Sequence, residues 1–241
     1  MMDLVERLRD CRDEMALRTG LLESLGCLGA RDFIHFTLVE EADALHGEAC
    51  VFIWSGQLER LCREYMVREH WLRDPVLVHA SLSVEPYRLS RIATLPTTGA
   101  RLFYAFLHRH GASNGIAIPV HGSSRDPTDV LVALPQDDTA DGEAHLLDSE
   151  PMLRALAYAV RAWRTSRLRA EVLARGDLDD IDQMLLQLTF RGFTRNDIAH
   201  ATGLSVGKVK GRSARVSNIF RQRSIEQAAR LAVRVGIVRL V

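Results

Sequence analysis

The chain has 241 residues, of which 47% are hydrophobic and 26% are charged, which is enough apolar material for one large domain or two ordinary ones. No run of 18 apolar residues occurs and the N-terminal segment MMDLVERLRDCRDEM is charged, so we expect neither a membrane span nor a signal peptide. The four cysteines show no CxxC or zinc-ligand spacing, which favours reduced thiols, a cytoplasmic protein, and no metal or cofactor.

Charge is divided unevenly along the chain, although the 31 basic and 31 acidic residues cancel overall. Residues 182–241 hold 11 basic and three acidic side chains, a net charge of +8, which leaves −8 for residues 1–181. A basic module joined to an acidic body is the pattern expected of a domain that binds phosphate groups. The division therefore predicts two domains.

The first 170 residues alternate between helix and strand signals. Apolar residues recur three or four apart, or follow a capping signal, in five segments that we predict as helices: 2–28, 57–68, one starting at Asp74-Pro75, 98–111 and 149–170. Four segments carry strand-forming residues: 32–39, 48–54, 114–121 and 129–135. The polar loop 121–128 joins the last two strands as a hairpin. These signals predict an α+β fold, with an α/β/α sandwich around an antiparallel sheet.

The remainder of the chain is predicted to be helical. We expect the first domain to span residues 1–170, a linker to cover 171–180, and an all-α domain of four helices to occupy 181–241. The first of these helices covers about 181–190, with inward side chains at Ile181, Met184, Leu185 and Leu188. The last covers about 224–236 and carries the small residues Ala228 and Ala232, followed by Val235.

Residues 194–220 contain two helices that meet at a tight turn. Thr194 is a good N-cap with Asp197 three residues later, Gly203 supplies the positive φ that ends a helix, and Ser205 caps the second helix. The second helix carries four basic residues between its apolar positions: Lys208, Lys210, Arg212 and Arg215. This is the helix-turn-helix pattern, in which the second helix enters the DNA major groove. The alternative is a surface helical hairpin, because helix–Gly–helix alone is common.

The tail resembles the LuxR-type, or GerE-like, DNA-binding domain. The matching positions are Gly192, Thr194, Ile198, Ala199, Leu204, Ser205, Val209, Lys210, Asn218, Ile219, Ala228, Ala232, Gly236 and Ile237. The chain departs from the family at Asp197, Lys208 and Arg212, where Glu, Thr and His are usual. Gly207 and Gly211 weaken the second helix by roughly 1 kcal/mol each relative to Ala, or else permit close approach to DNA. The resemblance implies contacts with dyad-symmetric double-stranded DNA from Thr194, Arg195, Ser205, Lys208, Lys210, Arg212 and Arg215.

The N-terminal part resembles the acyl-homoserine-lactone-binding domain of the LuxR quorum-sensing regulators. REYMVREHWLRDPV matches the family pattern Y-x(8)-D-P-V, and NGIAIPVHG matches G-[IV]-x-x-P-[VI]-H-G. The resemblance implies that Asp74 accepts the ligand amide N–H and that Tyr65 lies in the ligand site. The alternatives are that Asp74 is only a helix N-cap and that Tyr65 is only a core residue.

Several hydrogen-bond donors of that family are missing here. The tryptophan that donates to the lactone carbonyl falls at Leu61, a second tryptophan at Leu89, the tyrosine that donates to the acyl carbonyl at Gln57, and a frequent serine or threonine near Val132. An unmade buried hydrogen bond costs about 1–3 kcal/mol. We therefore expect ordinary lactones to bind poorly, and the site to take a more hydrophobic ligand or to be filled by side chains.

Two functions fit the sequence. The first is a sequence-specific transcription regulator that forms a homodimer, partly through Ala228, Ala232 and Val235, because small residues let helices approach closely. The second is an anti-activator that forms a heterodimer with an intact LuxR-type regulator and blocks its DNA binding. No P-loop, H-E-x-x-H or G-x-S-x-G motif is present, so we do not expect an enzyme.

Overall fold

The computed structural model describes residues 2–38, 50–121 and 128–238. Within these ranges the chain forms two compact units, one from its start to Trp163 (unit 1) and one from Arg164 onward (unit 2). The predicted hairpin loop 121–128 lies almost entirely outside the described residues, as do positions 48 and 49 of the second predicted strand.

Unit 1 is built on an antiparallel sheet that has five strands among the described residues. The strands are β1 (Ala30–Leu38), β2 (Cys50–Trp54), β3 (Tyr87–Arg88), β4 (Ile116–Val120) and β5 (Thr128–Pro135). Their order is β2-β1-β5-β4-β3, with every neighbouring pair antiparallel. The α+β prediction is confirmed; the two-residue strand β3 was not predicted, because so short a segment has no alternation to recognise.

Seven helices begin in unit 1 within the described residues: α1 (Met2–Arg9), α2 (Glu14–Gly26), α3 (Glu59–Val67), α4 (Pro75–Leu82), α5 (Thr98–Arg109), α6 (Ala140–Asp148) and α7 (Glu150–Leu173). Three 3-10 turns accompany them: η1 (Gly56–Leu58), η2 (His70–Arg73) and η3 (Leu89–Thr94). Residues 2–28 form two helices because Asp13 caps α2 through the Ala16 N–H. The unpredicted helix α6 has the same signal, since Thr139 accepts a hydrogen bond from the Gly142 N–H.

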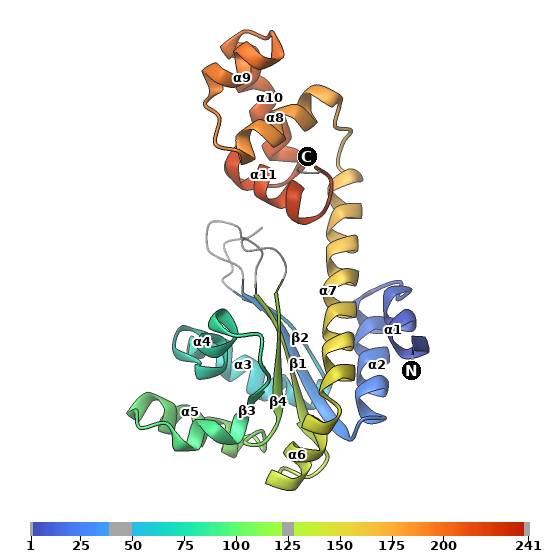
Figure 1. Ribbon diagram of the computed structural model, residues 1–241, viewed down its shortest axis with the longest axis vertical. Coiled ribbons are helices and arrows are strands. Elements are labelled where there is room, and N and C mark those ends of the chain that lie inside the picture. Colours follow the sequence, from blue (N-terminus) through green and yellow to red (C-terminus); the bar gives the residue numbers. More distant parts are fainter. Residues whose placement is uncertain (1, 39–49, 122–127, 239–241) are drawn as a thin grey trace. The chain divides into compact units, whose positions relative to one another are not determined.

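The sheet has a helical layer on each face, as Figure 1 shows. Side chains alternate between the faces along each strand. In β1, Phe33 packs with α1, α2 and α7, whereas Ile34 and Phe36 pack with α3, α4 and α5. In β5, Leu131 takes the first face and Val132 the second. The result is two separate apolar layers, one on each side of the sheet, as expected for an α/β/α sandwich.

Helix α7 is longer than predicted. It runs to Leu173, so residues 171–173 of the expected linker are helical. The division between the two compact units falls within this helix, after Trp163. Val172 is fully buried and belongs to the apolar core of unit 2. The non-helical part of the expected linker is therefore reduced to residues 174–179.

Unit 2 contains four further helices among the described residues: α8 (Asp180–Phe190), α9 (Arg195–Thr202), α10 (Val206–Ile219) and α11 (Ile225–Arg234). They enclose one core, in which Leu185, Val209 and Phe220 are almost fully buried. Met184, which we predicted to face inward, is 43% exposed. Leu186 is buried instead, because positions 182, 185, 186 and 189 form the inward face of α8.

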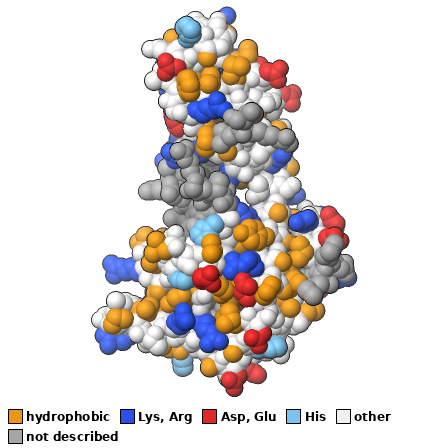
Figure 2. Space-filling view, viewed as in Figure 1, with side chains coloured by type: hydrophobic (Ala, Val, Ile, Leu, Met, Phe, Trp, Pro, Cys, Tyr) orange, Lys and Arg blue, Asp and Glu red, His pale blue; other side chains and the backbone are white. Residues whose placement is uncertain are grey.

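The described surface shows no membrane-spanning feature. No helix in the described ranges is long and apolar enough to cross a membrane. On the face drawn in Figure 2, apolar side chains are scattered among charged side chains of both signs. Scattered exposed apolar residues are normal for a folded domain surface and require no special explanation.

Candidate functional site

A small cavity lies in unit 1 between the sheet and the layer formed by α3, α4 and α5. Its volume is about 40 Å³, room for a few water molecules. Five of the six residues predicted for a ligand site line it: Leu61, Tyr65, Asp74, Leu89 and Val132. The others on its wall are Ile34, Phe36, Cys62, Val76, Phe103, Leu107, Ala112 and Leu134. Strand alternation could have found Ile34, Phe36 and Leu134, which share a sheet face with Val132.

Gln57 does not belong to this cavity, which corrects the sequence-based assignment. It lies in η1, where the turn directs Leu58 into the core and leaves Gln57 exposed. A single 3-10 turn has three residues per turn, so neighbouring side chains point in different directions. The position that the family resemblance gave to a tyrosine donor therefore supplies no group to this cavity.

Asp74 and Tyr65 form the polar end of the cavity. The Tyr65 hydroxyl donates to Asp74 Oδ2 at 2.7 Å, and the Val76 N–H donates to Asp74 Oδ1 at 2.8 Å. Asp74 is 3% exposed, and burial raises its pKa to about 6 although these hydrogen bonds oppose the shift. Asp74 caps α4, and the same carboxylate also lines the cavity.

The wall at Leu89 is held by a close backbone contact and a buried acid. The Leu89 N–H donates to the Gly115 carbonyl at 2.9 Å. A Cβ at Gly115 would lie 2.7 Å from the Ala133 carbonyl oxygen, so only glycine allows β4 and β5 to approach so closely there. Glu143, which is 1% exposed, accepts hydrogen bonds from the N–H groups of Gly115 and Ser90. These contacts fix η3, and with it Leu89, against the sheet.

The second candidate site is the helix pair α9–α10 in unit 2. Thr194 and Asp197 form a capping box, in which the Asp197 N–H donates to Thr194 Oγ1 and the Thr194 N–H donates to Asp197 Oδ2. Gly203 ends α9 with φ +67°, and the Ser205 hydroxyl accepts the Lys208 N–H at the start of α10. The structure thus has two capped helices joined through Gly203, as the sequence predicted for residues 194–220.

Helix α10 has a buried side and an exposed side that carries mostly small residues. Val209, Ser213 and Val216 face the core. Four exposed positions follow one another along the opposite side: Gly207, Gly211, Ala214 and Asn218. Lys208 and Lys210 are exposed beside this line, and neither forms an ion pair with a described residue. Thr194, Arg195 and Ser205 are exposed as well.

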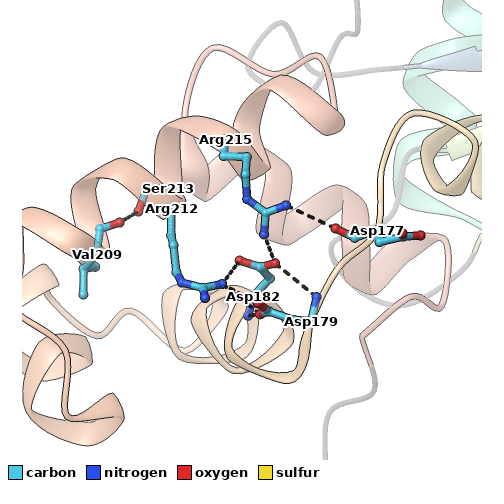
Figure 3. A network of polar contacts seen from close by, with 7 residues as sticks. All are labelled: Asp177, Asp179, Asp182, Val209, Arg212, Ser213 and Arg215. Atoms are coloured by element: carbon cyan, nitrogen blue, oxygen red, sulfur yellow. Dashed lines mark hydrogen bonds and ion pairs between the residues drawn. The ribbon is translucent and has the colours of Figure 1, made fainter.

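Arg212 and Arg215 are directed differently from the lysines, as Figure 3 shows. Arg212 Nη1 donates to Asp179 Oδ2 at 2.7 Å and to Asp182 Oδ1 at 2.8 Å. Arg215 donates to Asp182 Oδ2 and to the Asp177 carbonyl oxygen. Hydrogen bonding to Asp179 raises the pKa of Arg212, and the same contact lowers the pKa of Asp179. Both arginines therefore join α10 to the start of α8, which the sequence reasoning missed.

The residues predicted for subunit contact are core residues. Ala228 and Ala232 are fully buried and Val235 is 3% exposed, all within the core of unit 2 itself. A side chain already covered by its own domain cannot form the face of a second interface, so this assignment is corrected. The exposed side of α11 carries Glu226 and Arg230 instead.

Titratable side chains do not gather into a metal site in the described part of the chain. No group of three or more His, Cys, Asp or Glu side chains is placed to hold a metal ion there. His110, near the end of α5, is hydrogen-bonded to Glu64 Oε2 at 3.0 Å, and this contact lowers the pKa of Glu64. His110 is thus held by a carboxylate partner on α3.

Comparison with protein families gives the class of the protein. The family profile described as the autoinducer binding domain matches residues 25–162, more than half of the chain. The chain belongs to this family, the sensor domain of LuxR-type quorum-sensing regulators. Comparison with curated protein sequences finds no match.

Solved structures share the fold at low sequence identity. The chain is similar to SdiA of Escherichia coli, with a TM-score of 0.67, 14% identity, and coverage of 99% of this chain and 98% of that one. A structure of SdiA in complex with octanoyl-rac-glycerol gives a TM-score of 0.67 at 12% identity, covering 100% and 96%. CepR2 of Burkholderia cenocepacia, described as an N-acylhomoserine-lactone-dependent LuxR-family transcription factor, gives 0.54 at 15% identity, covering 70% and 95%.

Proposed function

We propose that the protein is a sequence-specific, DNA-binding transcription regulator of the LuxR type that acts as a homodimer on dyad-symmetric DNA. The observation that carries the proposal is the α9–Gly203–α10 geometry, with Lys208 and Lys210 exposed on the second helix and unpaired with described acids. In a helix-turn-helix domain the second helix lies in the major groove, and its first turns reach the bases.

The four basic residues of α10 divide into two roles under this proposal. Lys208 and Lys210 provide the direct DNA contacts, whereas Arg212 and Arg215 stabilise the domain through Asp182. Arg215 is 47% exposed at its side chain, so its outer N–H groups can still reach a phosphate. Thr194, Arg195 and Ser205 lie at the N-termini of α9 and α10, where backbone N–H groups also favour phosphate.

The test is DNA selection from a random pool by the purified homodimer, followed by fluorescence anisotropy on the selected site. Lys210→Ala is expected to cost about 1–3 kcal/mol of binding and to relax specificity at one base position. Lys208→Ala is expected to weaken binding to every sequence and to flatten the salt dependence. Arg60→Ala, at an exposed position of α3, is the control and leaves DNA binding unchanged. Normal binding by both lysine variants would overturn the recognition-helix assignment.

We further propose that the sensor domain is altered for acyl-homoserine lactones. Leu61, Leu89 and Val132 line the cavity and offer no side-chain hydrogen-bond donor to the lactone or acyl carbonyls. Two carbonyls left unpaired in an apolar cavity would each cost about 1–3 kcal/mol. Ordinary lactones are therefore expected to bind poorly, and the small volume of the cavity adds to this expectation.

One observation favours the alternative function, an anti-activator that pairs with an intact LuxR-type regulator. The outer line of α10 carries Gly207, Gly211 and Ala214, which have no side-chain group that could hydrogen-bond to a base edge. The DNA selection separates the two functions. A homodimer that enriches no site, yet reduces the DNA binding of an intact family member when mixed with it, is an anti-activator.

A further inference from the structure

A groove with a volume of about 790 Å³ opens on the surface of unit 1, separate from the cavity beside Asp74. Its lining comes from two segments, the stretch around β3 and η3 and the junction of α6 and α7. The lining residues are Glu85, Pro86, Arg88, Arg91, Leu147, Glu150 and Arg154, and none of them lines the cavity. A groove of this volume has room for a small metabolite, and three of its seven lining side chains are arginines.

Arg88 is held in the groove wall without a good hydrogen-bond acceptor. Its Nε is buried and forms no hydrogen bond within the described part of the chain, and the acid that pairs with it, Glu143, has its Oε2 3.9 Å away. Both Glu143 oxygens already accept hydrogen bonds, Oε1 from the N–H groups of Ser90 and Gly115 and Oε2 from the Ser90 hydroxyl. A partly buried guanidinium without an acceptor costs free energy that a ligand oxygen would recover.

Arg91 and Arg154 add further N–H groups to the same groove. Arg91 is exposed, and its side chain forms neither a hydrogen bond nor an ion pair with any described residue. Arg154 is fixed in place, because its Nε donates to Glu150 Oε1 at 2.5 Å, its Nη1 to the Pro119 carbonyl at 3.2 Å and its Nη2 to the Val84 carbonyl at 2.9 Å. Each Nη of Arg154 therefore keeps one N–H for a ligand. Guanidinium groups bind oxyanions through such paired N–H donors.

The other lining residues restrict the kind of anion. Glu150 is neutralised by its ion pair with Arg154. The Glu85 carboxylate is exposed and receives no hydrogen bond from the residues that the structure describes. It repels a bare anion, but as an acceptor it suits hydroxyl groups. The apolar part of the lining is limited to Pro86 and Leu147, which is too little for an acyl chain. The groove therefore suits a ligand that carries both an anionic group and hydroxyl groups.

We propose that this groove binds a small phosphorylated polyol of the sugar phosphate class, with its phosphate on Arg88 and Arg91 and its hydroxyl groups on Glu85. At pH 8 a phosphate monoester carries close to two negative charges, which balance two guanidinium groups, whereas a carboxylate balances one. The site goes beyond the proposed DNA-binding function. Arg88 directly precedes Leu89, which lines the cavity, so a phosphate bound here connects the segment carrying a cavity wall residue with Arg154 on α7.

The test is isothermal titration calorimetry of the full-length protein at pH 8 and constant ionic strength. The probes are glycerol 3-phosphate, glucose 6-phosphate, phenyl phosphate, glucose and glutamate. Both polyol phosphates are expected to bind at least about fivefold more tightly than phenyl phosphate, which has the same charge but no hydroxyl groups. Glucose and glutamate are expected to bind at least about tenfold more weakly than the polyol phosphates, because neither carries a dianionic group for the two arginines.

Two variants and two controls locate the binding. Arg91→Ala is expected to weaken all three phosphates about tenfold, and Arg91→Lys, which keeps the charge but not the fork of N–H donors, recovers only part of this loss. Glu85→Ala removes the acceptor for hydroxyl groups, so the preference for glycerol 3-phosphate over phenyl phosphate should fall below about twofold. Arg60→Ala, exposed on α3, and Lys210→Ala, exposed on α10 of the basic unit 2, are the controls and leave the series unchanged.

Each outcome decides the proposal. It is overturned if neither polyol phosphate binds, if phenyl phosphate or glutamate binds as tightly as they do, or if Arg91→Ala binds them normally. Weaker binding by Lys210→Ala also overturns it, because the phosphates would then occupy the DNA-binding helix. If the groove fails while the same preparation binds its selected DNA, the proposed function stands. Binding of the polyol phosphates by a protein that selects no DNA site is the opposite case.

Discussion

Asp74 combines two functions in one side chain, as the cap of α4 and as the polar end of the unit 1 cavity. Its raised pKa, about 6 against an ordinary value of 3.8, means that the folded protein holds this proton more tightly than the unfolded chain does. The stability from this proton is therefore fully present below about pH 4 and is lost as the pH rises through 6.

Asp74→Asn removes this pH dependence. We expect the unfolding free energy of the variant, relative to wild type, to increase by up to about 3 kcal/mol between pH 4 and pH 7.5, which is the energy of a shift of about two pKa units. Urea unfolding followed by tryptophan fluorescence measures it, because Trp71 packs beside Tyr65 at a ring-centroid distance of 6.5 Å. An unchanged difference between the two proteins over this range would contradict the burial of an ionisable Asp74.

Asp182 is the central residue of the network in Figure 3, with no exposed surface and with both Arg212 and Arg215 on its oxygens. Removing Asp182 takes away the carboxylate that pairs with Arg215, whereas Arg212 keeps its contact with Asp179. We expect Asp182→Ala to destabilise unit 2 by about 2 kcal/mol, below the range for a fully buried pair because both arginines are partly exposed. Asp180→Ala, exposed on the same helix, is the control. Hydrogen exchange of α8 and α10 amides measures both, and equal effects would show that the network does not hold α10.

At the scale of elements, α10 contains two glycines, which are poor helix formers: Gly207 in its first turn and Gly211 in its interior. A Cβ added at Gly207 or Gly211 meets no atom within 4 Å, and neither residue has positive φ. The folded domain by itself therefore gives no reason for glycine at either position, unlike Gly203, whose φ is +67°.

Gly207→Ala and Gly211→Ala are each expected to stabilise unit 2 by up to about 1 kcal/mol, whereas Gly203→Ala destabilises it. Thermal unfolding followed by far-ultraviolet circular dichroism checks the signs. DNA affinity then decides between the two explanations of the glycines. A stabilised variant that binds DNA less tightly means that the glycines permit close approach of the backbone, whereas unchanged affinity means that they only weaken the helix.

At the scale of the whole molecule, the chain consists of two compact units, each with its own apolar core or cores. All three tryptophans, Trp54, Trp71 and Trp163, lie in unit 1. Tryptophan fluorescence therefore reports on the sensor unit alone, while hydrogen exchange reports on both units.

Ala232→Arg places a long charged side chain in the fully buried core of unit 2. We expect loss of hydrogen-exchange protection over residues 180–238 and of DNA binding, with unchanged tryptophan fluorescence and retained protection in β1, β4 and β5. The control is Arg230→Ala, at an exposed position of the same helix, which keeps protection in both units. A folded Ala232→Arg monomer would restore the idea that this residue lies at a subunit interface.

The sequence by itself determined the features that depend on near neighbours. Capping at Asp74, Thr194 and Ser205 requires contacts only two or three residues away, so it can be recognised from the sequence. The alternation in β1 and β5 likewise follows from the period of a strand. These local rules were sufficient for the α+β class and for the capped ends of α4, α9 and α10.

Only the tertiary structure decided which side chains remain available to contact DNA, a second subunit or a ligand. Arg212 is hydrogen-bonded to Asp182, which lies 30 residues away in the sequence. Its positive charge alone suggested a contact with DNA, but in the fold an acidic side chain of the same unit pairs with it. Ala232 is small enough for a helix interface, but the packing of α8 against α11 encloses it within the domain. Gln57 and Leu61 are separated by a single turn, yet only Leu61 reaches the cavity. Burial and charge pairing depend on the element that packs opposite, and no local pattern contains that information.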